Sequence, residues 1–129
     1  MAIPPTATAL SQPLDPADID DYLLTVTKAG IDTTAFPMLE ANEGIASFTL
    51  ALAADAIAVG LTIRTSGEYP PPTLNGLDVK FWLSVDASLQ GATIFDAAGI
   101  TVAMELTIIT TSTPPRKRQK TATVRIANQ

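Results

Sequence analysis

The chain has 129 residues, of which 47% are hydrophobic and only 16% charged, against roughly 25% charged residues in an average soluble protein. This length fits one domain, and the composition indicates neither a disordered chain nor a basic protein that coats nucleic acid. Without cysteine the chain has no disulfides, thiolate nucleophiles or zinc–thiolate sites, and without histidine it lacks the commonest general base and metal ligand. We therefore expect no catalytic residue, metal ligand or cofactor, although composition leaves carboxylate and lysine chemistry open.

The first 17 residues contain four prolines, at positions 4, 5, 13 and 16. Each proline fixes φ and removes a backbone donor, so we predict an extended arm over 1–17 and a folded domain over 18–129. The arm either folds back on its own domain or clasps a neighbouring subunit. It has no positively charged start, and no run in the chain approaches the roughly 18 apolar residues of a membrane span. We expect neither a signal peptide nor a membrane segment.

Alternating apolar and polar residues, which are typical of strands, recur after an acidic segment over 16–21 that favours a short helical turn. Such alternation predicts strands over 22–27, 45–52, 57–64, 79–85, 100–108 and 121–126, and a short strand over 92–95. Residues 31–44 look irregular. The alanine-rich stretch 53–56 predicts a tight turn or a bend within one long strand, with helix as the main rival there.

Prolines and glycines mark the connections between these strands. Gly67, three consecutive prolines at 70–72, Asn75 and Gly76 predict a loop over 65–76 with a polyproline II segment, and Pro114 and Pro115 predict a turn. Strands joined by loops, with no convincing long helix, favour an all-β fold. We predict a single antiparallel β-sandwich of six to eight strands, either immunoglobulin-like or jelly-roll, carrying the extended Pro-rich N-terminal arm.

Four aspartates, at positions 15, 18, 20 and 21, form the densest carboxylate cluster, and closely spaced oxygens of this kind can bind calcium. An EF-hand loop starting at Asp18 would place Leu23 where glycine is needed and Ala29 where the bidentate Glu belongs. The motif therefore fails. We interpret the cluster as a solvated acidic turn, with an irregular metal site or a catalytic pair as alternatives.

Positive charge concentrates at the C-terminus, where Arg116, Lys117, Arg118, Lys120 and Arg125 are five of the eight Lys and Arg residues. Residues 1–115 hold three cations against all thirteen acids, a net charge of −10, whereas the tail carries +5. Nucleic acid is disfavoured as a partner because no aromatic stacking platform accompanies the basic residues. The basic hairpin is either a solvated turn that protects its sheet edge or a surface that docks on an acidic subunit.

Trp82, the sole tryptophan, alternates with the apolar residues of its predicted strand and shares a face with Lys80 and Ser84. It anchors an interface if that face is open, or belongs to the core if both faces are covered. The proline run at 70–72 is either a rigid connector or a ligand for an aromatic groove. The candidate interface residues are Ile3, Pro4, Pro5, Leu10, Trp82, Arg116, Lys117, Arg118 and Lys120.

Three segments together resemble small β-sandwich virion proteins of tailed bacteriophages, namely tail-fibre adaptors and capsid cement or decoration proteins. The segments are Ala-Val-Gly-Leu-Thr-Ile at 58–63, Gly-Leu-Asp-Val-Lys-Phe-Trp-Leu-Ser-Val at 76–85, and the terminal hairpin formed by 105–111 and 120–126. In such modules a strand ending in Thr leads through a basic turn into a final T-x-x-V strand. The resemblance covers about residues 45–127. Pro114 and Pro115 stand where such a turn often has glycine.

This resemblance implies a non-catalytic structural protein of the virion, assembled in the host cytoplasm, whose partners are other virion proteins and copies of itself. The first expectation is a cement subunit that docks on and stabilises the lattice of the major capsid protein. The alternative is a tail-to-fibre adaptor or another head–tail or tail subunit. From a different class, a carbohydrate- or protein-binding β-sandwich module also stays open, as does a carboxylate enzyme. No nucleic acid, membrane or small-molecule substrate is expected.

Overall fold

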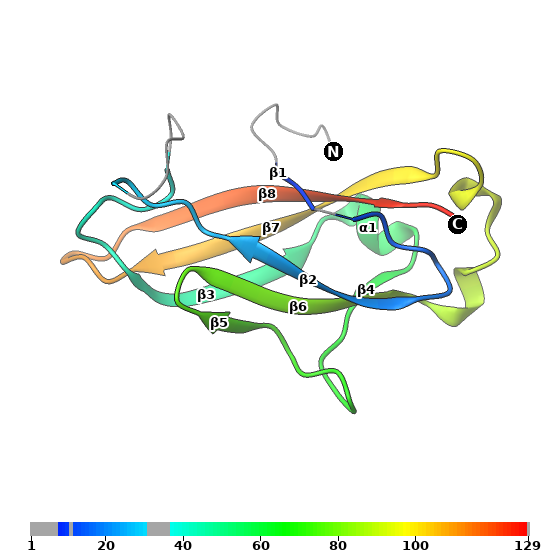
Figure 1. The fold of residues 1–129 in the computed structure, drawn as a ribbon, viewed down its shortest axis with the longest axis horizontal. Coiled ribbons are helices and arrows are strands. Elements are labelled where there is room, and N and C mark those ends of the chain that lie inside the picture. Colours follow the sequence, from blue (N-terminus) through cyan, green and yellow to red (C-terminus); the bar gives the residue numbers. More distant parts are fainter. Residues whose placement is uncertain (1–7, 11, 31–36, 129) are drawn as a thin grey trace.

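A computed structural model describes residues 8–10, 12–30 and 37–128 and shows an all-β sandwich of two facing sheets (Figure 1). Its strands in the described ranges are β1 (Thr8–Ala9), β2 (Ile19–Thr25), β3 (Ile45–Leu52), β4 (Leu61–Ile63), β5 (Thr73–Asn75), β6 (Asp78–Val85), β7 (Ile100–Thr110) and β8 (Lys117–Ile126). The predicted fold class is confirmed.

The strand order decides between the two predicted topologies. One sheet has the order β1-β8-β7-β3, and the other has the order β2-β6-β4, with β5 also paired to β6. All pairs are antiparallel except β1 with β8. If β2, β3, β4, β6, β7 and β8 are taken as strands B to G, the sheets are B-E-D and G-F-C, which is the immunoglobulin-type arrangement. The sandwich is therefore immunoglobulin-like, with β5 added between D and E.

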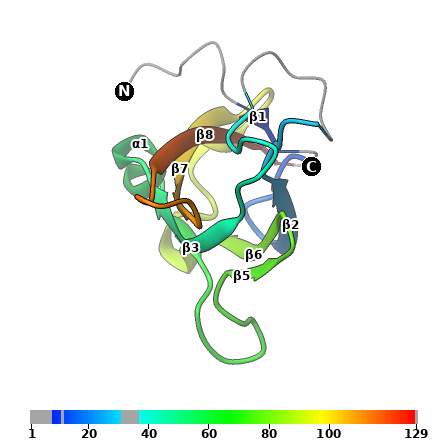
Figure 2. The same ribbon diagram turned by 90° about the vertical axis from the view of Figure 1, so that its left-hand side faces the viewer.

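The core lies where the apolar faces of the two sheets meet, between the strands seen end-on in Figure 2. In β6, Val79, Phe81 and Leu83 have no exposed surface, and neither do the alternate residues Val102, Met104, Leu106 and Ile108 of β7. The period of two that predicted these strands therefore also identified their buried faces. Burial of apolar surface is the main favourable contribution to the stability of such a domain.

The described part of the N-terminal segment lies along β8 of the same chain. Thr8 and Ala9 pair in parallel with Ala122 and Thr123, and the Leu10 N–H donates to the Thr123 carbonyl at 2.7 Å. Leu14 has no exposed surface and forms an isolated parallel bridge with Ile126. Residues 8–10 and 12–17 therefore fold back on their own domain. The candidate interface residues Ile3, Pro4 and Pro5 lie outside the described residues.

One predicted strand was wrong over much of its length. Instead of a strand over 57–64, the chain forms the short helix α1 (Ala54–Ala58) and only then β4. The helix occupies the connection between the two sheets, where Ala56 is fully buried. Alanine has the highest helix propensity. The helix propensity of this stretch, together with the need for the chain to cross between the sheets, outweighed the strand-like alternation of Ile57 and Val59.

The segment before β7 also differs from prediction. The expected strand over 92–95 is replaced by the single-turn 3₁₀ helix η2 (Thr93–Phe95), which follows another such turn, η1 (Ala87–Leu89). Only Phe95 of η2 is buried, so this segment is anchored by one side chain, whereas a strand would present an alternating face. Within the described ranges, no helix has the length and apolar character that a membrane span requires.

Three smaller differences concern strand ends. The helical turn expected over 16–21 is replaced by a tight turn at Pro16 and Ala17, and β2 begins at Ile19, so that Asp20 and Asp21 belong to the strand. β8 begins at Lys117, four positions before the predicted strand, because the basic residues themselves pair with β7. The predicted loop over 65–76 contains β5, which forms a hairpin with β6 through a turn at Gly76.

Candidate docking surfaces

The acidic cluster of the N-terminal segment does not assemble a site. The Asp15 carboxylate accepts the Ala17 N–H at 2.8 Å, and Asp21 forms an exposed ion pair of 3.5 Å with Lys80. Across the described residues, no three or more Asp and Glu side chains gather closely enough to hold a metal ion. The structure therefore uses these two carboxylates for a turn and for a sheet surface.

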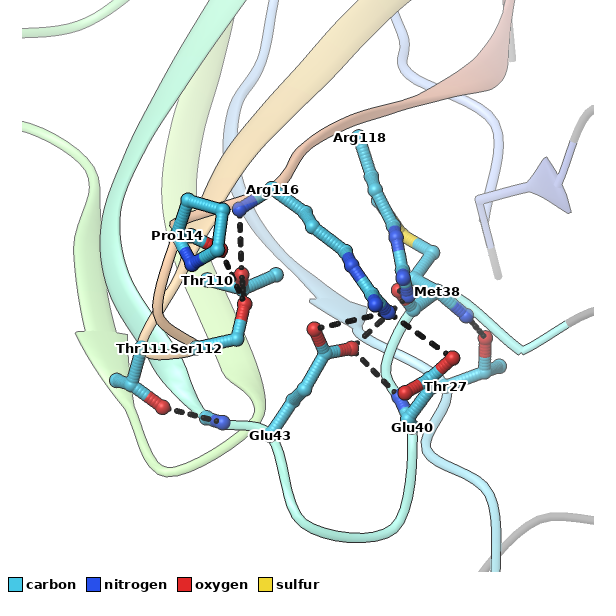
Figure 3. A network of polar contacts seen from close by, with 11 residues as sticks. Thr27, Met38, Glu40, Glu43, Thr110, Thr111, Ser112, Pro114, Arg116 and Arg118 are labelled. Carbon is cyan, nitrogen blue, oxygen red and sulfur yellow. Dashed lines mark hydrogen bonds and ion pairs between the residues drawn. The ribbon is translucent and has the colours of Figure 1, made fainter.

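The basic hairpin forms ion pairs with a loop of the same chain, over residues 38–44, in which no sequence motif marks a contact. Nη1 of Arg116 lies 3.0 Å from Glu40 Oε1 and 3.7 Å from Glu43 Oε2, and Nη1 of Arg118 lies 3.0 Å from Glu43 Oε1. Arg118 also donates to the Met38 carbonyl. Figure 3 shows the Glu43 carboxylate directed toward both guanidinium groups. Two of the four candidate basic residues of the tail are therefore engaged inside their own fold.

Glu43 is the centre of this network, because its side chain is only 1% exposed. The Glu40 N–H donates to Glu43 Oε1 at 2.8 Å. This hydrogen bond, helped by the Ser112 hydroxyl and by the charges of Arg118 and Arg116, holds the pKa of Glu43 below its ordinary value of 4.5 despite the opposing effect of burial. The carboxylate is charged at neutral pH and joins the loop to the hairpin.

Neutral hydrogen bonds fix the same junction. The Thr110 hydroxyl accepts the Arg116 N–H at 2.9 Å and lies 2.7 Å from the Ser112 hydroxyl, while Thr111 Oγ1 accepts the Gly44 N–H at 2.9 Å (Figure 3). The turn between β7 and β8 is thereby held by its own threonines and serine. Lone glutamates in an irregular segment gave no sequence signal for this contact, since the pairing partner is more than 70 residues away.

Lys117 and Lys120 are the remaining candidate basic residues. Neither has an ion-pair partner among the described residues. Lys117 is exposed and borders a shallow hollow of about 350 Å³ on the outer face of β3, β7 and β8, whereas Lys120 is half-buried. The charge that the hairpin can offer to a partner is therefore carried by these lysines more than by the neighbouring arginines.

Trp82 lies on the outer face of its sheet, not in the core. The Tyr69 ring packs against the Trp82 ring with centroids 5.3 Å apart and planes tilted by 56°. The Arg64 guanidinium carbon lies 5.1 Å from the Tyr69 ring centre, and Lys80 Nζ lies 5.8 Å from the Trp82 ring centre. We call Arg64, Tyr69, Lys80 and Trp82, with the neighbouring Leu23, the Trp82 face.

Local structure explains how this face is assembled. The Arg64 N–H donates to the Trp82 carbonyl at 2.8 Å, so Arg64 extends the pairing of β4 with β6. The loop from Arg64 to β5 extends from the sandwich in both views, and it carries Tyr69. Leu23, paired with Lys80 across β2 and β6, is 59% exposed. Trp82 and Tyr69 are half-buried. Partly exposed aromatic side chains beside apolar and cationic residues are typical of the anchors of protein interfaces.

A second hollow, of about 390 Å³, lies at the end of the Trp82 face. It is bordered by Ala17, Ile19, Thr62, Arg64, Ser84, Val85, Asp86, Ala87 and Gln90. Arg64 belongs both to this hollow and to the stack on Tyr69, and no ion-pair partner for its guanidinium occurs in the described residues. A planar guanidinium with free donors is suited to bind a carboxylate from a partner.

Leu10, the last of the described candidate interface residues, is half-buried against the core of its own domain. The structure therefore separates the predicted interface residues. Trp82 stands on the outer face of one sheet, the basic residues occupy the hairpin of the other, and Leu10 serves the domain itself. Comparison with protein-family models, with curated proteins and with solved structures found no match for this chain.

Proposed function

We propose that this chain is a non-catalytic structural protein of a tailed-phage virion, most specifically a capsid cement subunit that docks on the lattice of the major capsid protein. The observation that carries the proposal is the Trp82 face. A large aromatic side chain on the outside of a sheet, flanked by an exposed leucine and two cations, is suited to dock on another protein. Two of the three cations of residues 1–115 belong to this face.

Charge distribution supports docking as the task. The body of the chain is acidic, so like charge disfavours indiscriminate association with other acidic proteins. Arg64 provides a local cationic contact, whereas Lys80 is paired with Asp21 on the same face. A tail-to-fibre adaptor would use the same kind of surface and is the second structural candidate. The partner in either case is a virion protein with acidic and apolar side chains at its docking surface.

The test is to purify the full chain alone and mixed with assembled capsid shells or isolated tails, followed by mass measurement of the complexes. We expect association with shells, and replacement of Trp82 by alanine should weaken it by about 2 kcal/mol or more, the threshold of an interface hot spot. The matched control is Ile57→Ala, because Ile57 is 62% exposed and belongs to α1, away from β6.

Each outcome has a distinct meaning. Association with tails alone favours the adaptor over the cement subunit. A chain that binds neither shells nor tails contradicts the virion proposal, and equal losses in the Trp82→Ala and Ile57→Ala variants contradict the role of the Trp82 face. Circular dichroism of both variants verifies that the sandwich is intact.

A carbohydrate-binding module is favoured by one observation, the hollow that lies beside the Tyr69–Trp82 pair and contains Arg64, Asp86 and Gln90. Aromatic rings with nearby polar groups can hold a sugar ring. Trp82 is the sole tryptophan, so its fluorescence reports directly on ligands at this place. A saturable change on titration with bacterial surface polysaccharide would support this function, and an unchanged spectrum would argue against it.

A further inference from the structure

The strand β3 forms one edge of its sheet, and its sequence lacks the charges and prolines that usually protect an edge. It is the last strand in the order β1-β8-β7-β3, so within the described residues it has a hydrogen-bonded strand on one side only. Its eight residues, Ile-Ala-Ser-Phe-Thr-Leu-Ala-Leu, include no charge and no proline. Natural edge strands usually carry lysines or prolines, or are very short, because unpaired backbone groups attract another strand.

The apolar side chains of β3 are covered less completely than those of β7. Phe48, Leu50 and Leu52 are only half-buried although they pack against the core. Their partners across the ladder, Ile108, Leu106 and Met104, have no exposed surface. The two strands thus present the same apolar face, but β7 is covered on both sides and β3 on one. A further strand beside β3 would complete the burial of three large apolar side chains.

We infer that β3 pairs antiparallel with β3 of a second copy, joining two sheets into one across a two-fold axis. Antiparallel addition at an edge is an established mode of strand recognition, and two-fold dimers use the same patch on both copies. The edge of β3 and the Trp82 face belong to different sheets and are different surfaces. The partner is a second copy because the strand is complementary to itself.

The self-complementarity follows from the sequence of the strand. In antiparallel pairing, opposite residues must point to the same face, so the register that places Thr49 opposite Thr49 also places Phe48 opposite Leu50 and Ser47 opposite Ala51. Apolar side chains then meet on the core side and small side chains on the outer side. No charges oppose each other. The five residues 47–51 lie beyond the register shift between Ile45 and Ser47, where the strand is regular.

Two substitutions test this arrangement in the full chain. Thr49→Lys places two like charges directly opposite each other, which destabilises a cross-strand pair, while leaving an exposed position exposed. Thr62→Lys is the matched control, because Thr62 is an exposed threonine of β4 in the other sheet. By mass measurement over a range of concentrations, we expect a dimer for the wild type and for Thr62→Lys, and a monomer for Thr49→Lys.

The absence of cysteine allows a direct test of the register. A single Thr49→Cys substitution places two thiols across the proposed axis, within the separation that a disulfide spans. Mild oxidation should convert this variant to a covalent dimer, whereas Thr62→Cys should stay largely uncrosslinked. A wild type that is monomeric at every concentration overturns the inference. A dimer that survives Thr49→Lys, or that fails to crosslink through Cys at 49, overturns it as well.

Discussion

At the scale of single residues, the ion pairs of Glu43 strengthen the attachment of the loop before β3 to the terminal hairpin. Replacing Glu43 by glutamine keeps the size of the side chain and removes the charge that Arg116 and Arg118 share. We expect a lower urea midpoint at pH 7. Glu40→Gln is the control, because Glu40 is 58% exposed and its pair with Arg116 should contribute less than about 1 kcal/mol.

The pH dependence has a definite sign. Because the pKa of Glu43 is lower in the folded state, its stabilising effect is fully present above its ordinary value of 4.5 and is lost as the pH falls through the folded pKa. Between pH 7 and acid pH, the wild type should therefore lose more stability than Glu43→Gln, as measured by urea unfolding. Parallel pH profiles for the two proteins would contradict this role of Glu43.

Tyr22 provides a second test at the residue scale, with the opposite pH sign. Its ring packs on Phe81 with centroids 6.1 Å apart, and its hydroxyl is buried with no hydrogen-bond partner among the described residues. Burial, with smaller contributions from Asp20, Asp18 and Asp21, raises the pKa of Tyr22 to about 12. Stability linked to this group is fully present below pH 10.0 and is lost as the pH rises through about 12.

Tyr22→Phe removes both the buried hydroxyl without a hydrogen-bond partner and the group that titrates at high pH. At pH 7 the variant should be as stable as the wild type or more stable by about 1 kcal/mol, since an unsatisfied buried hydroxyl is removed. At pH 11 it should retain more of its stability than the wild type does. Urea unfolding at the two pH values measures both differences. A loss above about 1 kcal/mol at pH 7 would show that the hydroxyl has a stabilising partner.

At the scale of elements, two glycines with similar backbone angles separate the effect of φ from the effect of packing. Gly76, in the β5–β6 turn, has a φ of +64° and open space where a Cβ would stand. Gly99, which precedes β7, has a φ of +69°, and a Cβ there would lie 2.0 Å from the Ile126 carbonyl oxygen. A side chain at position 99 would therefore meet both an unfavourable backbone angle and a clash with the end of β8, whereas a side chain at position 76 would meet only the unfavourable angle.

We expect Gly76→Ala to lower the free energy of unfolding by about 1–2 kcal/mol, the cost of a left-handed alanine. Gly99→Ala should lower it by about 4 kcal/mol or more, because the β7–β8 ladder would have to move to admit the methyl group. Urea unfolding of the two variants measures the contrast. Similar losses would mean that the Gly99 turn relaxes without disturbing β8.

The N-terminal segment offers a further contrast at this scale. Leu14 has no exposed surface, and its N–H and carbonyl are hydrogen-bonded to Arg125 and Ala127. Leu14→Ala should therefore cost about 2–5 kcal/mol, as in a core. The control Leu23→Ala, at a position that is 59% exposed, should change stability by less than about 0.5 kcal/mol. Equal effects in thermal unfolding would place Leu14 outside the cooperative domain.

The same elements show which parts of the fold the sequence patterns predicted correctly. Alternation identified the strands with two well-defined faces, such as β6 and β7, because burial there follows the period of two. It failed over residues 57–60, where alternating residues belong to α1 and the turn after it. A period of two does not encode where the chain must leave one sheet for the other.

The candidate surfaces were predictable only in part. The position of Trp82 opposite the apolar residues of β6 followed from the sequence, but its exposure depended on which face was covered. The partners Tyr69 and Arg64 come from a loop whose path no local pattern specifies. The same holds for Glu43, because an ion pair between distant segments requires knowledge of the strand order. Long-range pairing was therefore the missing information in each case.

At the scale of the whole molecule, the division between an acidic body and a basic tail has a different meaning once the ion pairs are known. Arg116 and Arg118 are bound by Glu40 and Glu43, so much of the apparent dipole is satisfied within the chain. The molecule carries a net charge of −5. Lys117 and Lys120 are cations of its tail that have no ion-pair partner among the described residues. Surface charges without an ion-pair partner influence the rate of association more than the stability of the fold.

This division predicts that the paired arginines of the hairpin stabilise the fold, whereas its lysines affect association with a partner. Replacing Lys117 and Lys120 together by serine should leave the free energy of unfolding within about 0.5 kcal/mol per substitution, because neither lysine has an ion-pair partner among the described residues. Arg118→Ser should lower the thermal unfolding temperature clearly, since the buried carboxylate of Glu43 then loses its nearer cation. Thermal unfolding of the two variants measures this difference.

In association with capsid shells, the double lysine substitution should have a larger effect than Arg118→Ser. If the shell surface is acidic, the double lysine variant should associate more slowly than the wild type at low salt, and the two rates should converge as salt screens the exposed charges. Arg118→Ser should retain the salt dependence of the wild type at temperatures where it is folded. If the lysine variant keeps the wild-type rate at every salt concentration, the hairpin does not steer docking, and the Trp82 face alone remains as the proposed contact.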